Sequence, residues 1–123
     1  MAESVDAFDE IQTIRIRLDA IEQTQEMLVR ANAAEVLADV DSLVDQDPLA
    51  ARTYLLVDGA QTQQDIGSAL GTSQQTVSRK LDKLLELHLI RVIDNRGGGN
   101  VYAKAAADRI LRLSSRIQRR LPK

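Results

Sequence analysis

The 123-residue sequence contains no cysteine, which excludes disulfide bonds, thiolate metal sites and redox sensing by a thiol. It contains a single histidine, His88, and its carboxylates are scattered along the chain. A metal site built on His88 would have to collect ligands without any recognisable spacing. We therefore expect no metal ion and no cofactor.

The sequence also lacks a group suited to catalysis. His88 lies in the apolar run LELHLI, where a hinge or core histidine is expected rather than a general base. The glycines at 97–99 lie between two stretches that are expected as strands, whereas a phosphate-binding glycine loop needs a helix to start after it. We therefore do not expect an enzyme.

Aromatic residues make up only 2% of the chain, so an aliphatic core must be built from the 44% of hydrophobic residues. Without an aromatic platform for base stacking, single-stranded nucleic acid is not expected as the main ligand. No apolar run approaches the roughly 20 residues that a membrane span requires. The N-terminal stretch MAESVDAFDE lacks the apolar segment of a signal peptide, which predicts a cytoplasmic protein without membrane contact.

The net charge of −2 conceals an uneven distribution of charge along the chain. Residues 1–58 contain 13 acidic and 4 basic residues, a net charge of −9, and residues 59–123 contain 5 acidic and 12 basic residues, a net charge of +7. A cationic half beside an acidic half predicts a local surface that attracts phosphate groups. The alternative is that charged helix surfaces are unevenly sampled by chance.

Residues 5–46 contain no proline or glycine and are expected to be helical throughout, as one helix or as two that meet near 29–33. An apolar stripe follows the heptad a and d positions, with Gln25 as the polar member. A stripe this narrow is typical of a helix–helix seam, and it predicts dimerisation; the alternative is packing against the rest of its own chain. The predicted dimerisation residues are Ile11, Ile14, Leu18, Ile21, Gln25 and Leu28.

Residues 62–94 contain two short amphipathic helices joined at Gly71. Thr62 is suited to cap the first helix, and Thr72 or Ser73 to cap the second. Gly67 allows a close helix crossing, and Gly71 is suited to a left-handed helix end. The second helix has an apolar face and an opposite face that is polar and cationic, an arrangement that presents side chains to a major groove. The apolar face is formed by Val77, Leu81, Leu84 and Leu85.

This segment resembles the winged helix-turn-helix of bacterial and archaeal transcription regulators of the MarR/ArsR type. The resemblance rests on Asp65-Ile66, on Ala69-Leu70-Gly71, on the run SQQTVSR at 73–79 and on LLELHLI at 84–90, and it covers roughly residues 48–113. The family usually has alanine where this chain has Gly67, and an apolar residue at Thr72. The resemblance implies the winged helix-turn-helix fold and binding of double-stranded DNA.

The flanking segments complete this fold. Asp47-Pro48 predicts a helix break. Residues 48–57 are expected as the next helix, with Leu49, Tyr54, Leu55 and Val57 facing inward, and residues 60–61 as a brief strand. Residues 89–94 and 101–104 are expected as strands around a turn at 95–100, and residues 105–121 as one helix with Ala106, Ile110, Leu113 and Ile117 inward. We predict a mainly α fold with a small β-hairpin wing (α+β), divided into 1–46 for dimerisation, 47–105 for DNA binding and 106–123 as a C-terminal helix.

DNA contacts are predicted from the second helix of the motif and from the hairpin. Arg79 is suited to bond guanine, and Gln74 or Gln75 to bond adenine. Arg96, on a flexible glycine tip, is suited to enter a minor groove or to contact phosphate. Lysines and arginines nearby are expected to neutralise phosphates. The predicted helix contacts are Ser73, Gln74, Gln75, Thr76, Ser78, Arg79, Lys80 and Lys83. The predicted wing contacts are Arg91, Asn95, Arg96, Gly97, Gly98, Asn100 and Lys104.

The sequence therefore favours a homodimeric, sequence-specific regulator that reads an inverted repeat in double-stranded DNA, acts as a repressor and is associated with the nucleoid. The alternative is a module for protein–protein interaction in a transcription, replication or partition complex. For that role, the acidic N-terminal region offers a face for a basic partner, formed by Asp39, Asp41, Asp45 and Asp47.

Overall fold

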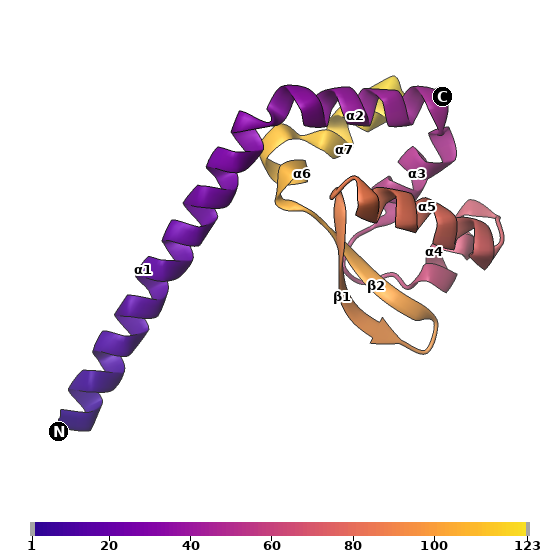
Figure 1. Ribbon diagram of the computed structural model, residues 1–123. Coiled ribbons are helices and arrows are strands. Elements are labelled where there is room, and N and C mark those ends of the chain that lie inside the picture. The colour runs from indigo at the N-terminus through magenta and orange to yellow at the C-terminus, as the bar shows by residue number, and fades with distance from the viewer. Residues whose placement is uncertain (1, 123) are drawn as a thin grey trace.

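The computed structural model describes residues 2–122 and the side chains from Ala7 onward (Figure 1). Helix α1 (Ala2–Ala31) extends away from the rest of the molecule, and α2 (Ala33–Gln46) turns back over it. The remaining elements form a compact body below α2. The predicted α+β fold with a hairpin wing is confirmed.

The long N-terminal helical region is two helices, which meet at Asn32. This residue leaves helical geometry, with φ −102° and ψ 12°, and its side-chain amide donates to the Leu28 carbonyl at 3.0 Å. Asparagine bonds backbone groups readily through its short side chain, which explains a change of direction at this position. The break separates an exposed arm from a helix that belongs to the core.

The core lies between α2, α3 (Pro48–Leu56), α5 (Gln74–Glu86) and the C-terminal helices. Val40 of α2 is fully buried, as are Leu113 and Ile117 near the C-terminus. In α3 the residues fully buried are Ala50, Ala51, Thr53 and Tyr54. Leu49 and Leu55, expected to face inward, are only half-buried.

The helix-turn-helix consists of α4 (Gln63–Leu70) and α5 (Gln74–Glu86). Thr62 caps α4 in a reciprocal capping box with Asp65, and Ser73 caps α5 by accepting from the Thr76 amide. Gly71 ends α4 in the left-handed region, with φ 65°. A Cβ on Gly67 would lie 3.3 Å from the Thr72 carbonyl oxygen, so the tight turn favours glycine there. These local predictions are confirmed.

Strands β1 (Ile90–Arg96) and β2 (Gly99–Lys104) form an antiparallel hairpin. The pairing continues to Arg96 and Gly99, so the turn expected at 95–100 shrinks to Gly97 and Gly98. Gly99, the first residue of β2, has φ 112°, a backbone conformation that glycine adopts readily. The brief strand expected at 60–61 is a single antiparallel bridge between Thr62 and Val101.

The single C-terminal helix predicted over 105–121 is wrong. The chain forms α6 (Ala106–Leu111) and α7 (Leu113–Arg120), separated by Arg112 in the left-handed region at φ 54°. Asp108 stabilises the break, since its carboxylate accepts from the Ser114 amide at 2.9 Å and from the Tyr54 hydroxyl at 2.7 Å. The kink turns Ala107 into the core and leaves Ala106 and Ile110 half-buried.

No helix in the described part of the chain is both long enough and apolar enough to span a lipid bilayer.

Candidate DNA interface

Helix α5 has a sharp division between a buried and an exposed side. Val77, Leu81 and Leu84 are fully buried against the body. At 100° per residue, the opposite side is centred on Gln75, Arg79 and Asp82, all of which are exposed. Ser73, Gln74 and Lys83 are also exposed, whereas Thr76, Ser78 and Lys80 are half-buried. Among the DNA contacts predicted for α5, Gln75 and Arg79 therefore point most directly away from the core.

The N-terminus of α5 is held rigidly against the preceding helix. The Gln63 side-chain amide donates to the Gln74 carbonyl at 3.1 Å. The Ser73 and Thr76 hydroxyls lie 2.8 Å apart, and Ser73 also caps the helix. These two hydroxyls are therefore engaged in holding the start of the helix. The side-chain amides of Gln74 and Gln75 are the polar groups at that end that are available to contact DNA.

Lys80 and Lys83 contact one carboxylate oxygen, Asp47 Oδ2, at 2.9 and 3.3 Å. Asp47 also accepts from the Ala50 amide and so caps α3. Burial raises the pKa of Asp47, but the hydrogen bonds from Lys80, Ala50 and Lys83 outweigh it and lower the pKa below its ordinary value. Two cations predicted to meet phosphate are thus bound to the corner between α2 and α3 in the free protein.

The wing tip is anchored, in contrast to the flexible tip that its glycines suggested. The Gly98 carbonyl accepts from the Gln64 amide at 3.2 Å. A Cβ on Gly98 would lie 2.7 Å from Thr62 Oγ1, so glycine is required for this close contact. Gly97 has open space around it. The wing and the helix-turn-helix are therefore held in one arrangement.

The polar side chains of the wing are partly engaged with one another. Arg96 contacts Asp94 at 3.0 Å and the Ala60 carbonyl at 3.4 Å, and it remains half exposed. The Asn95 amide donates to Asn100 Oδ1 across the hairpin at 2.7 Å. Arg96 is thus placed next to the tip with an exposed guanidinium, while the two asparagines bridge the strands.

Two further cations predicted as wing contacts, Lys104 and Arg91, lie away from the wing tip. Lys104 donates to the Leu55 carbonyl at 3.3 Å and sits over the Tyr54 ring, 5.4 Å from its centroid. Arg91 is exposed at the base of the wing, far along β1 from the tip. Gln74, Gln75 and Arg79 are therefore exposed on α5 and Arg96 is exposed beside the wing tip, whereas Lys104 is held against α3.

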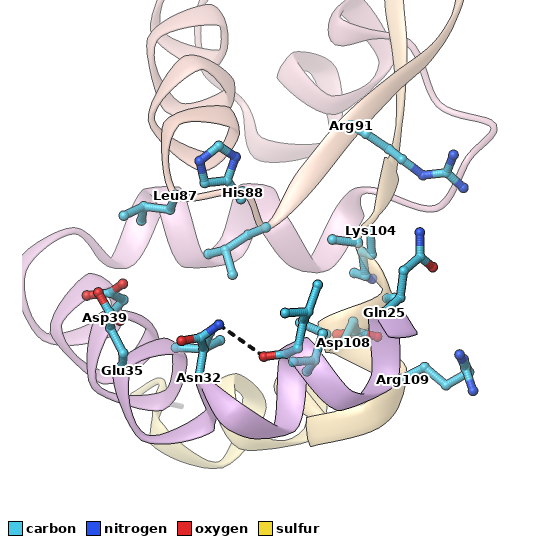
Figure 2. Close-up of a pocket in the computed structure, with 17 residues that line it drawn as sticks. Gln25, Asn32, Glu35, Asp39, Leu87, His88, Arg91, Lys104, Asp108 and Arg109 are labelled. Carbon is cyan, nitrogen blue, oxygen red and sulfur yellow. Dashed lines mark hydrogen bonds between the residues drawn. The ribbon is translucent and has the colours of Figure 1, made fainter. Parts of the chain in front are cut away.

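A groove of about 910 Å³ separates the end of α1 from the corner between α5 and β1 (Figure 2). Its walls carry both signs of charge, from Glu35 and Asp39 on one side and Arg91 and Arg109 on others. His88, expected at a hinge or in the core, is exposed at the groove, where it ends α5 with φ 58°. The groove could not be predicted from the sequence, because its lining comes from segments far apart in the chain.

The predicted dimerisation stripe on α1 is exposed in the single chain. Ile11, Ile14 and Leu18 are 51, 55 and 53% exposed, and Ile21 and Leu28 are 55 and 58% exposed. Three large apolar residues outside the stripe, Phe8, Ile16 and Met27, are exposed as well. The arm therefore leaves a continuous apolar face uncovered, and the alternative that it packs on its own body fails for residues 7–24.

The acidic face proposed for a basic partner is largely occupied from within the chain. Arg116 of α7 forms a two-pronged contact with Asp41, at 2.8 and 2.7 Å, and Arg120 reaches Asp45 at 3.0 Å. The Arg116 hydrogen bond lowers the pKa of Asp41 and raises that of Arg116. With Asp47 bound to two lysines, these carboxylates clamp α2 to its neighbours.

Among the side chains of residues 7–122, no group of three or more His, Asp or Glu is placed to hold a metal ion.

The Crp-like helix-turn-helix domain family matches residues 34–101, which is more than half of the chain. Two solved structures are similar. The S. aureus MepR–DNA complex shares 23% identity and a TM-score of 0.48, covering 75% of this chain and 70% of that one. RV1404 from Mycobacterium tuberculosis shares 17% identity and a TM-score of 0.47, covering 83% and 74%. No curated protein matches significantly.

The family match spans α2, the helix-turn-helix and the hairpin up to Val101, so it includes α5 and the tip of the wing. The predicted resemblance to winged helix-turn-helix regulators is thereby confirmed. The chain belongs to the Crp-like helix-turn-helix domain family and is a non-enzymatic, DNA-binding transcription regulator.

Proposed function

We propose that this regulator binds a specific inverted repeat in double-stranded DNA as a homodimer. The observation that carries the proposal is the exposed, rigidly capped start of α5, where Gln74, Gln75 and Arg79 face away from the core. Amide and guanidinium groups read adenine and guanine edges in the major groove. Arg96 beside the anchored wing tip supplies a second contact, to a minor groove or to phosphate.

The homodimer is supported by the exposed stripe on α1. Ile and Leu residues at heptad spacing, each about half exposed, become buried when two such arms pair. A dimer with two-fold symmetry reads half-sites about one helical turn, roughly 34 Å, apart. Bound over such a repeat, the dimer would occlude the DNA, so we propose repression by steric exclusion and a location on the nucleoid.

Replacing the two arginines tests this proposal. We expect Arg79→Ala to lose about 1–3 kcal/mol of binding free energy and to relax base preference at one position. Arg96→Ala should weaken binding to all sequences alike. Binding is measured by fluorescence anisotropy on duplexes selected from a random library, at several salt concentrations.

Arg119→Ala is the matched control, because Arg119 is an exposed arginine on α7 and bonds only a carbonyl of its own helix, that of Ser115. It should bind like the wild type. Equal losses in all three variants, or no duplex affinity of the wild type at low salt, would refute sequence-specific reading by α5.

A further inference from the structure

We infer that the two α1 arms pair as a parallel, in-register coiled coil, so that both winged helices lie at the same end of it. This inference rests on the proposed homodimer and adds its geometry. The apolar stripe alone does not choose a direction, because a and d residues can be buried in parallel or antiparallel pairs. The choice comes from the charged residues that flank the stripe and from its polar member.

The charged residues that flank the stripe at e and g positions form no ion pairs with one another among the side chains described for a single arm. Glu10 and Arg17 occupy g positions, and Arg15 and Glu22 occupy e positions of the heptads defined by the stripe. Among the side chains described for α1, an ion pair joins only Glu26 to Arg30. The four g and e side chains are thus available to a partner.

In a parallel pair, each g residue faces the e residue of the next heptad on the partner. Glu10 then meets Arg15 of the second copy, and Arg17 meets its Glu22. Two-fold symmetry makes each contact twice. In an antiparallel pair, g faces g and e faces e, so Arg17 approaches Thr24, and both parallel contacts are lost. The one opposite-charge contact that these four residues then make is between Arg15 and Glu22.

Gln25 favours the same direction. In a parallel pair it faces its own copy across the seam, where two side-chain amides can donate to and accept from each other. An antiparallel alignment that covers the stripe places Gln25 against Ile14, where its buried amide lacks a partner and costs stability. A polar residue at an a position is a known means of fixing register.

Single cysteines test the direction directly, because the chain contains no cysteine of its own. Ile11 and Gln25 are both a residues and lie about 21 Å apart along the helix axis. A disulfide requires Cα atoms within about 7 Å. An antiparallel pair can place at most one of these positions opposite its own copy, whereas a parallel pair places both.

We therefore expect full-length Ile11→Cys and Gln25→Cys each to form a covalent dimer on mild oxidation, seen on a non-reducing gel. Ile16→Cys, an exposed f position, is the control and should cross-link far less. Cross-linking at only one of the two a positions, or equally at Ile16, overturns the parallel arrangement while leaving a dimer seen by light scattering intact. A monomer in light scattering overturns the proposed homodimer itself.

Charge reversal gives an independent test by sedimentation. Arg17→Glu should raise the dimer dissociation constant roughly five- to tenfold, since two attractions become repulsions. Adding Glu22→Arg should restore the wild-type value. An unchanged dissociation constant in Arg17→Glu contradicts the parallel pairing, because Arg17 would then face Thr24.

Discussion

Asp47 is a single residue with three structural tasks. It ends α2, caps α3 and binds Lys80 and Lys83 of α5 through one carboxylate oxygen. The first two tasks depend on hydrogen bonding and the third on charge. An asparagine would keep the cap, since Asn and Asp are about equally good N-caps, but would lose the pull on the lysines.

We expect Asp47→Asn to tighten binding to duplex DNA at low salt, because Lys80 and Lys83 become free to meet phosphate. The slope of log affinity against log salt should steepen by between about one and two. Isothermal titration over a salt series measures both. Asp45→Asn removes the same charge but affects Arg120 of α7, which keeps its contact with Asp41 at 3.4 Å, and it should leave the slope unchanged. A weaker binding of Asp47→Asn at constant slope would show instead that Asp47 positions α5.

At the scale of elements, the sequence predicted what depends on near neighbours. The caps of α4 and α5, the left-handed Gly71 and the break at Pro48 all follow from residues within one turn of each other. The kink at Arg112 was missed because Asp108, which accepts from the Ser114 amide across the kink, is also held by Tyr54, a residue 54 positions away. The anchored wing tip was missed likewise, since Gly98 packs on Thr62.

The same reasoning explains why the candidate site was predicted only in part. The amphipathic pattern of α5 identified Gln75 and Arg79 as exposed, because helical periodicity alone decides that. It did not reveal which cations have partners elsewhere. Lys104 and Lys80 are engaged by groups from α3 and from the α2–α3 corner, which the sequence separates by more than thirty residues.

The clamp between α2 and α7 should weaken in acid. Arg116 lowers the pKa of Asp41, so this carboxylate contributes stability above the ordinary aspartate pKa, and the contribution is lost as the pH falls through the lowered value. We expect thermal melts between pH 7 and pH 2.5 to show a smaller acid-induced drop in melting temperature for Asp41→Asn than for the wild type. Asp39→Asn, two residues before Asp41 and outside the clamp, should follow the wild type. Identical acid profiles for all three proteins would contradict the clamp.

At the scale of the molecule, the arm and the body perform separable tasks. The buried core begins with Val40 and continues to Ile117, and residues 7–24 contribute nothing to it. A change in the outer part of α1 should therefore alter pairing while the winged helix stays folded. Binding to an inverted repeat depends on both parts. Once one winged helix is bound to its half-site, the paired arms hold the second winged helix near the other half-site, and this tethering raises the affinity.

Leu18→Asp separates these tasks. A carboxylate in the middle of the seam should give a monomer in light scattering, with the circular dichroism melt of the body preserved. We expect affinity for the full inverted repeat to fall about 10²–10⁴-fold, the gain that tethering supplies, while affinity for a single half-site changes little. Ile16→Asp adds the same charge at an exposed position outside the stripe and should remain dimeric. Retention of a Leu18→Asp dimer would move the interface away from α1, and equal losses on both DNA lengths would show that the arm also supports the reading helix.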